Sequence, residues 1–281
     1  MNIKIVTDSS ANLPALEGIP YESVPLKLVT DTKEFVDDRS LDCAAMMAYL
    51  DSYKGRSGSS CPNVGDWLEA FGDAEGVFTL AISRSMSGSH NAALQAKEVY
   101  EEEHPGRRVC CLDTLTTGPE LIMLAEKIRE LAARGLEFDE IEEQILRYMD
   151  STHMVFMLSS VDNLAKNGRV NPLIAKAVGF LNIRIVGQAS DSGTFQQMHK
   201  SRGEKKGIDA LYSLMQENGY RGSTVRINHV FNEVGALALQ ELILRDFPGT
   251  DVSVTPTTGL CSFYAEQGGI MVGFEGNPIH S

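Results

Sequence analysis

Short apolar runs of strand length alternate with longer segments of helical period along the first half of the chain. Three such runs stop at a polar turn before a helical segment, at residues 3–6, 77–82 and 109–112. Two amphipathic helices follow over residues 120–134 and 138–150, with Gly135 between them as a C-terminal cap. The alternation predicts an α/β domain with a largely parallel sheet, and ligands bind such sheets at the strand ends.

The pattern changes from residue 154, where strands and helices no longer alternate regularly. We predict helices near residues 173–180, 204–217 and 233–247, and a hairpin turn over residues 190–193. The predicted strands are residues 154–158, 183–189, 194–199, 224–229, 251–255 and 269–274. The chain therefore divides into an N-terminal parallel-sheet α/β domain, residues 1–153, and a C-terminal mixed α+β domain, residues 154–281.

Composition narrows the class of ligand. The 281 residues carry a formal net charge of −13, which repels phosphate backbones and anionic membrane surfaces, so we expect no nucleic-acid partner. No apolar run reaches the roughly 18 residues of a membrane helix, so we expect no stable membrane insertion. The five cysteines are odd in number, lack a CxxC spacing and follow no signal peptide, which favours a reducing cytoplasm.

Two short loops rich in hydroxyl groups suggest an anion site. They are residues 57–63 (SGSSCPN) and 85–90 (SMSGSH), and each precedes a helical pattern. Free backbone N–H groups and the helix dipole favour a bound anion at such positions, so we interpret the two segments as one carboxylate-binding cradle. Ordinary structural roles stay open, with Ser87 as a helix N-cap before Gly88 and Ser59 as a turn residue.

The sequence contains none of the familiar catalytic signatures, namely a Walker loop, GxGxxG, HExxH or GxSxG. The six histidines show no i,i+4 pairing, so we expect no metal site. A serine hydrolase stays open as an alternative, with Ser87 as nucleophile, His90 or His229 as base, and Asp113 orienting the base. Sequence spacing does not show whether these side chains meet.

Further segments stand in a fixed order along the chain. They are residues 5–14 (IVTDSSANLP), 59–63 (SSCPN), 87–93 (SGSHNAA), 163–170 (NLAKNGRV), 181–185 (LNIRI), Arg202 and 259–269 (GLCSFYAEQGG). In this order they resemble the DegV family of bacterial fatty-acid-binding proteins, the group that includes the FakB subunits of fatty acid kinase. The resemblance spans nearly the whole chain.

The resemblance implies two α/β domains that enclose one long-chain fatty acid, with no other cofactor. It assigns the carboxylate contacts to the hydroxyls of Ser59 and Ser87, with Ser60, Gly88 and Ser89 in support. Physically, an ionised carboxylate accepts hydrogen bonds at both oxygens, so hydroxyl and backbone donors satisfy it without a buried counter-ion. The alkyl tail is expected to be buried.

This chain departs from the family pattern at three positions. Ser59 replaces a threonine and keeps the hydroxyl, and Asn63 replaces a serine and keeps a donor. Thr257 stands where kinase-linked members carry a histidine, so the kinase partnership is in greater doubt than lipid binding. The resemblance also points to Arg202 and Arg169 as contacts for a phosphate or a partner protein.

Our interpretation is a cytoplasmic, non-enzymatic binding protein for a long-chain fatty acid such as palmitate, serving lipid transport or fatty acid metabolism. It would present the acid to a separate kinase subunit. The alternative is a small-molecule enzyme in the same cleft, either a serine hydrolase or a transferase acting on a carboxylate. The sequence does not identify the residues that line the pocket, because an apolar residue belongs to an ordinary core more often than it contacts a lipid. Examples of such apolar residues are Met46, Phe78, Ile82, Leu115, Phe180 and Ile270.

Overall fold

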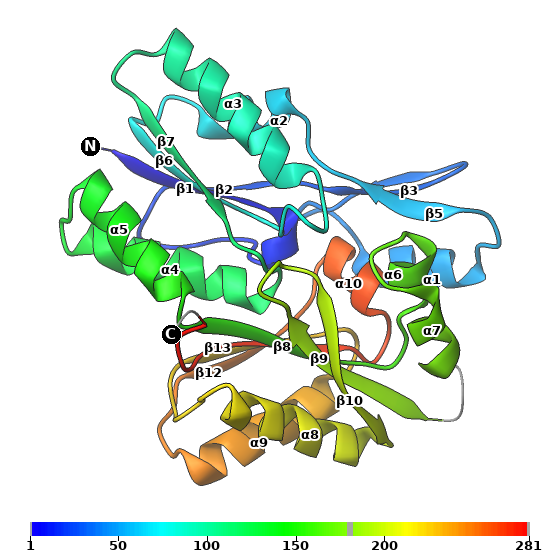
Figure 1. The fold of residues 1–281 in the computed structure, drawn as a ribbon. Coiled ribbons are helices and arrows are strands. Elements are labelled where there is room, and N and C mark those ends of the chain that lie inside the picture. The colour runs from blue at the N-terminus through cyan, green and yellow to red at the C-terminus, as the bar shows by residue number, and fades with distance from the viewer. Residues whose placement is uncertain (1, 179–181, 280–281) are drawn as a thin grey trace.

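A computed structural model describes residues 2–178 and 182–279 (Figure 1). Its first half is built on a four-stranded sheet of order β2-β1-β6-β7, in which every neighbouring pair is parallel. The strands are β1 (Ile3–Asp8), β2 (Tyr21–Val24), β6 (Gly76–Ala81) and β7 (Arg108–Asp113). The predicted parallel sheet and the strands read from the three apolar runs are confirmed.

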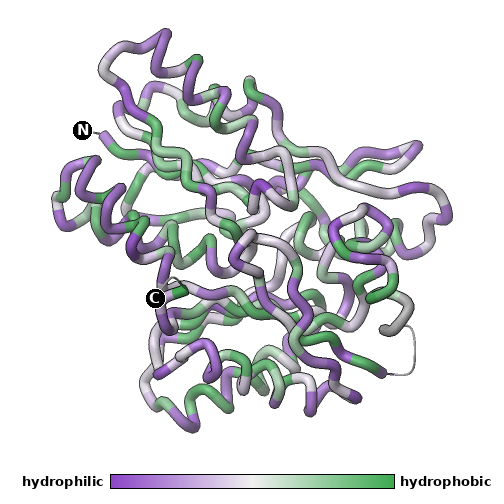
Figure 2. The backbone as a smooth tube through the Cα atoms, in the orientation of Figure 1, coloured by the Kyte–Doolittle hydropathy of each residue, from purple (hydrophilic) through white to green (hydrophobic). Residues whose placement is uncertain are grey.

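Helices cover both faces of this sheet. One face packs against α2 (Val64–Phe71) and α3 (Ser89–Glu103), the other against α4 (Pro119–Ala133) and α5 (Phe138–Met149). The ring of Phe78 on β6 stacks on that of Phe138, with centroids 4.5 Å apart. Figure 2 shows hydrophilic and hydrophobic residues alternating along α3 and α5, as expected for helices with one face on a core.

The second half is built on a six-stranded mixed sheet of order β10-β9-β8-β13-β11-β12. Its strands are β8 (Thr152–Leu158), β9 (Ile183–Ala189), β10 (Phe195–Arg202), β11 (Val225–His229), β12 (Val252–Pro256) and β13 (Ile270–Glu275). The predicted mixed topology and the hairpin between β9 and β10 are confirmed. Helices α8 (Glu204–Glu217) and α9 (Glu233–Asp246) cover one face and share a core with it.

The helix predicted over residues 173–180 corresponds to α7 (Pro172–Val178). The end of that prediction, including Phe180, lies outside the described residues. Among the helices of the described part, none combines the length and the apolar character needed to cross a bilayer.

A small antiparallel sheet of order β4-β3-β5 was not predicted. It consists of β3 (Lys27–Thr30), β4 (Glu34–Val36) and β5 (Ser57–Ser60). Our interpretation of residues 57–60 as a loop was therefore wrong. Serine and glycine have low strand propensity and show no apolar alternation, so the strand exists only through backbone pairing with β3, where Ser59 opposes Leu28.

Several elements join the two halves. Helix α4 packs on the first sheet and also against β13, whose Gly273 leaves room for it, since a Cβ there would lie 2.8 Å from the Glu120 nitrogen. Helix α10 (Gly259–Ala265), near the end of the chain, packs against α1 (Cys43–Ser52) and β3. The buried Asp37 carboxylate accepts hydrogen bonds from the Gly259 and Leu260 N–H groups at 2.6 and 2.9 Å. Residues of both halves therefore enclose the space between them.

Candidate functional site

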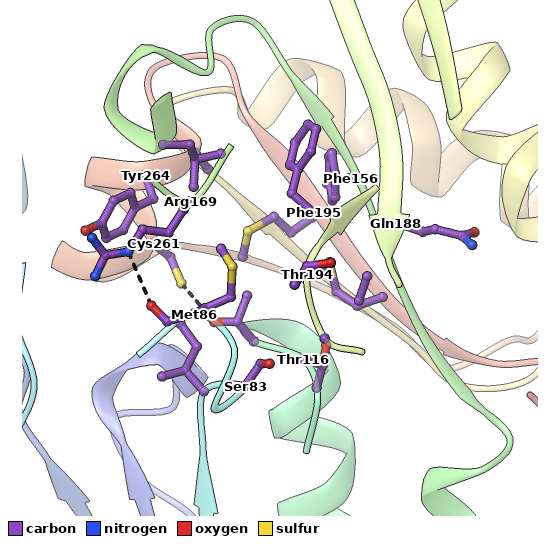
Figure 3. Close-up of a pocket in the computed structure, with 18 of the residues that line it drawn as sticks. Ser83, Met86, Thr116, Phe156, Arg169, Gln188, Thr194, Phe195, Cys261 and Tyr264 are labelled. Atoms are coloured by element: carbon purple, nitrogen blue, oxygen red, sulfur yellow. Dashed lines mark hydrogen bonds between the residues drawn. The ribbon is translucent and has the colours of Figure 1, made fainter. Parts of the chain in front are cut away.

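An apolar cavity lies between the two halves (Figure 3). Its walls come from the loops that follow β6 and β7, from α6 (Asp162–Lys166) and α10, and from the strands β8, β9, β10 and β13. Its apolar lining consists of Ile82, Met86, Leu115, Met154, Phe156, Leu158, Leu164, Ala189, Phe195, Leu260, Cys261, Ala265 and Met271. Such a lining suits a hydrocarbon chain and penalises an unpaired charge.

The parallel strands explain why two of these loops meet the cavity. Strands β6 and β7 end at the same edge of the sheet, so their following loops lie side by side, as expected for a ligand site in an open sheet. The hairpin between β9 and β10 closes on Leu115, because Gly193 has no side chain: a Cβ there would lie 2.8 Å from the Leu115 Cα. Leu115 itself has a φ of 54°, a strained value for leucine.

The two hydroxyl-rich segments meet near the cavity. Cys61, which follows β5, places its sulfur 3.2 Å from where a Cβ on Gly88 would lie, so the ends of both segments are in contact. The Ser59 and Tyr264 hydroxyl oxygens are 2.8 Å apart, and Tyr264 lines the cavity from α10. Ser59 and Ser87 themselves are not among the residues that line the cavity, and the single carboxylate cradle stays a prediction.

Ser87 lies in the turn before α3. Its backbone N–H donates to the Ser83 carbonyl at 3.2 Å, and its Oγ accepts from the Ser89 N–H at 3.3 Å. The N-cap of α3 is Gly88, which has no side chain to cap the helix. Because the Ser87 oxygen acts here as an acceptor, its own proton is available to a ligand.

The supporting positions Ser89 and Ser60 differ in their surroundings. Ser89 is buried and donates its hydroxyl to Asp8 Oδ2 at 2.6 Å, which ties α3 to the end of β1. Burial raises the pKa of the Asp8 carboxyl, and hydrogen bonds from Ser10, Ser89 and the Ile82 N–H partly offset that effect. Ser60 is exposed at the end of β5.

The two candidate arginines lie in different places. Arg169 lines the cavity: its Nε donates to the Met86 carbonyl at 3.3 Å, and its guanidinium carbon lies 5.8 Å from the Tyr264 ring centroid (Figure 3). Arg202 is exposed at the end of β10 and is not part of the cavity lining. The structure thus brings only Arg169 to the site.

The side chains of the alternative serine hydrolase site do not come together in the structure. His90 Nδ1 is buried without a hydrogen-bond partner, and burial lowers the pKa of this imidazole. His229 Nδ1 accepts from the Asn232 N–H at 3.2 Å, and Asp113 pairs with Arg84 at 2.9 Å. Across the described residues, no hydrogen bond joins either histidine to Ser87.

Sequence reasoning missed most of the lining. Of the six apolar positions named from sequence, Ile82 and Leu115 line the cavity. Met46, Phe78 and Ile270 belong to ordinary cores, and Phe180 is outside the described residues. Tyr264 carries no local signal of a binding role, since only its contact with Ser59, 205 residues away, reveals it.

Thr257, which the resemblance aligns with a histidine of kinase-linked members, is buried. Its hydroxyl donates to the His229 carbonyl at 3.3 Å and lies 2.7 Å from the Ser262 hydroxyl. Both contacts are internal, and Thr257 does not line the cavity.

Comparison with known proteins gives consistent matches over nearly the whole chain. A family model described as "Uncharacterised protein, DegV family" matches residues 2–276. A DegV domain-containing protein of Streptococcus pneumoniae is 41% identical over 280 residues, which covers 98% of this chain and 99% of that protein.

Two solved structures superpose closely on this chain. One is a DegV family protein from Eubacterium eligens loaded with heptadecanoic acid, with a TM-score of 0.96, 40% identity, and coverage of 98% of this chain and 100% of that chain. The other is the Streptococcus pneumoniae fatty acid kinase (Fak) B3 protein loaded with linoleic acid, with a TM-score of 0.96, 40% identity, and coverage of 99% and 100%.

Proposed function

Because the chain belongs to the DegV family, we propose that it binds one long-chain fatty acid and acts as a binding protein rather than an enzyme. The observation that carries this proposal is the apolar cavity between the two halves, which has serine and tyrosine hydroxyls gathered near one side. The two similar structures hold heptadecanoic acid and linoleic acid. A cavity of this lining suits the same class of ligand.

We propose that the ligand's carboxylate binds at Ser59 and Ser87, where two hydroxyl donors serve its two oxygens. Its tail runs from the side of Tyr264 toward Phe195, the opposite sides of the cavity in Figure 3. The C-terminal domain, residues 154–281, covers this tail. Burying about fourteen methylenes contributes roughly 11 kcal/mol before association and ordering costs, so the acid stays bound through purification.

A partner kinase is the second part of the proposal. The similarity to the fatty acid kinase B3 protein supports presentation of the bound carboxylate to a separate kinase, which would transfer a phosphoryl group from ATP to give an acyl phosphate and ADP. The exposed Arg202 is the proposed contact for that partner.

The five free thiols support residence of the protein in a reducing cytoplasm.

Native and denaturing mass spectrometry of the purified protein, with solvent extraction of the released material, tests the binding. We expect one fatty acid per chain, unchanged in mass. The Ser59→Ala, Ser87→Ala double variant should purify empty, whereas Ser213→Ala, an exposed serine on α8, should keep the ligand. An empty wild-type protein that also fails to take up palmitate or oleate would refute the proposal.

A further inference from the structure

Tyr264 meets the proposed head-group site from the opposite half of the molecule. Ser59 lies on β5 in the first half, and Tyr264 lies on α10, near the end of the chain. Their hydroxyl oxygens are 2.8 Å apart, a normal hydrogen-bond distance. A side chain that both lines the cavity and touches a predicted carboxylate contact is a candidate for a role in ligand binding.

The direction of this hydrogen bond follows from acidity. A phenol is a stronger acid than an aliphatic alcohol and is therefore the better donor, whereas the serine oxygen is the better acceptor. With Tyr264 donating to Ser59 Oγ, the Ser59 proton is free to point at a ligand oxygen. Hydrogen bonds in such a chain polarise one another, so the Ser59 hydroxyl becomes a stronger donor.

The tyrosine ring is held in place by contacts that do not involve its hydroxyl. It packs edge-on against Phe263 with centroids 4.8 Å apart, and the Arg169 guanidinium lies over it at 5.8 Å. The two N–H bonds to Asp37 fix the start of α10. The phenol is thus positioned before any ligand arrives, which lowers the ordering cost of binding.

We propose that Tyr264 is a positioning residue of the head-group site, acting through Ser59 and making the site selective for an ionised carboxylate over a neutral alcohol. This inference rests on the proposed fatty-acid function. Hydrogen bonds to an ionised acceptor are about twice as strong as those to a neutral one, so a better aligned and more polarised Ser59 donor favours the carboxylate. An alcohol of equal chain length gains little from it.

The test compares palmitate with 1-hexadecanol in wild type and Tyr264→Phe, a change that removes the hydroxyl and keeps the ring. Delipidated protein is titrated with each ligand, and binding is followed by tryptophan fluorescence or calorimetry. We expect the palmitate Kd to rise about fivefold, the effect of one hydrogen bond, and the hexadecanol Kd to change less than twofold. The control is Tyr212→Phe, which removes a hydroxyl that donates to Asp246 outside the cavity.

The outcomes separate this inference from the broader function. Equal loss for both ligands means that the Tyr264 hydroxyl does not distinguish an ionised head group from a neutral one, and no loss for either means that this hydroxyl is irrelevant; each result overturns the proposal. In a Ser59→Ala background, Tyr264→Phe should cause no further loss of palmitate affinity, and a repeat of the fivefold loss refutes the route through Ser59. If wild type binds neither ligand, it is the fatty-acid function itself that has failed.

Discussion

Glu120 should make the stability of this protein fall as pH rises through the neutral range. It lies in the first turn of α4, is 5% exposed, and accepts a hydrogen bond from the Thr152 hydroxyl at 2.6 Å. Within the described residues, no lysine, arginine or histidine forms an ion pair with it. Burial raises its pKa from 4.5 to about 7, because the ionised form loses its hydration.

The direction and size of this pH effect follow from the number of protons that the folded and unfolded states bind. An unfolded glutamate ionises near 4.5 and the folded one near 7, so between these values the folded protein holds a proton that the unfolded chain has lost. The contribution of Glu120 to stability is therefore greatest at low pH, falls through this window, and levels off about one pH unit above the folded pKa. At about 1.36 kcal/mol per pKa unit, the total loss is about 3 kcal/mol, of which about 2.5 kcal/mol falls between pH 5 and pH 8.

Glu120→Gln isolates this contribution, since glutamine keeps an oxygen for Thr152 and never ionises. Urea unfolding from pH 5 to 8, followed by the fluorescence of the single, fully buried Trp67, gives the free energy of unfolding for both proteins. We expect the difference between variant and wild type to grow by about 2.5 kcal/mol over this range. Other titrating groups cancel in that difference.

The matched control is Glu98→Gln, an exposed carboxylate on α3, which should leave the pH dependence unchanged. Parallel stability curves for wild type and Glu120→Gln would show that Glu120 stays ionised at low cost and that the argument from burial is mistaken.

Three further predictions concern the cavity and its supports. Ala189→Phe, on the cavity wall where Ala189 pairs with Phe195 across β9 and β10, should raise the palmitate Kd at least tenfold and the octanoate Kd much less, because only a long tail reaches it; equal losses in calorimetry would contradict the tail's direction. Asp37→Ala should lower the free energy of unfolding by about 2 kcal/mol in urea, since it leaves two buried N–H groups of α10 unpaired, and an unchanged midpoint would argue against that anchor. Phe78→Ala should cost about 4 kcal/mol because it empties a fully buried ring site, and a loss under 1 kcal/mol would indicate that the core collapses to fill it.

The local pattern of apolar and polar residues was sufficient to predict much of the fold. The strand over Ile183–Ala189 and the helices over Glu204–Glu217 and Phe138–Met149 were predicted within one residue at each end. In these segments the apolar positions repeat with the period of the element, because one face must be buried. The mixture of a parallel and a mixed sheet followed from how those elements alternate.

The carboxylate candidates Ser59 and Ser87 were also identified from sequence, because hydroxyls before a helix have a simple chemical meaning. What tertiary structure alone decided is how they are arranged. Strand β5 forms only by pairing with β3, and its serines carry no strand signal of their own. Tyr264 joins Ser59 across 205 residues, and the cavity exists because two halves with separate cores meet around α10. Such contacts depend on which surfaces fold against each other, and no local period along a chain encodes that choice.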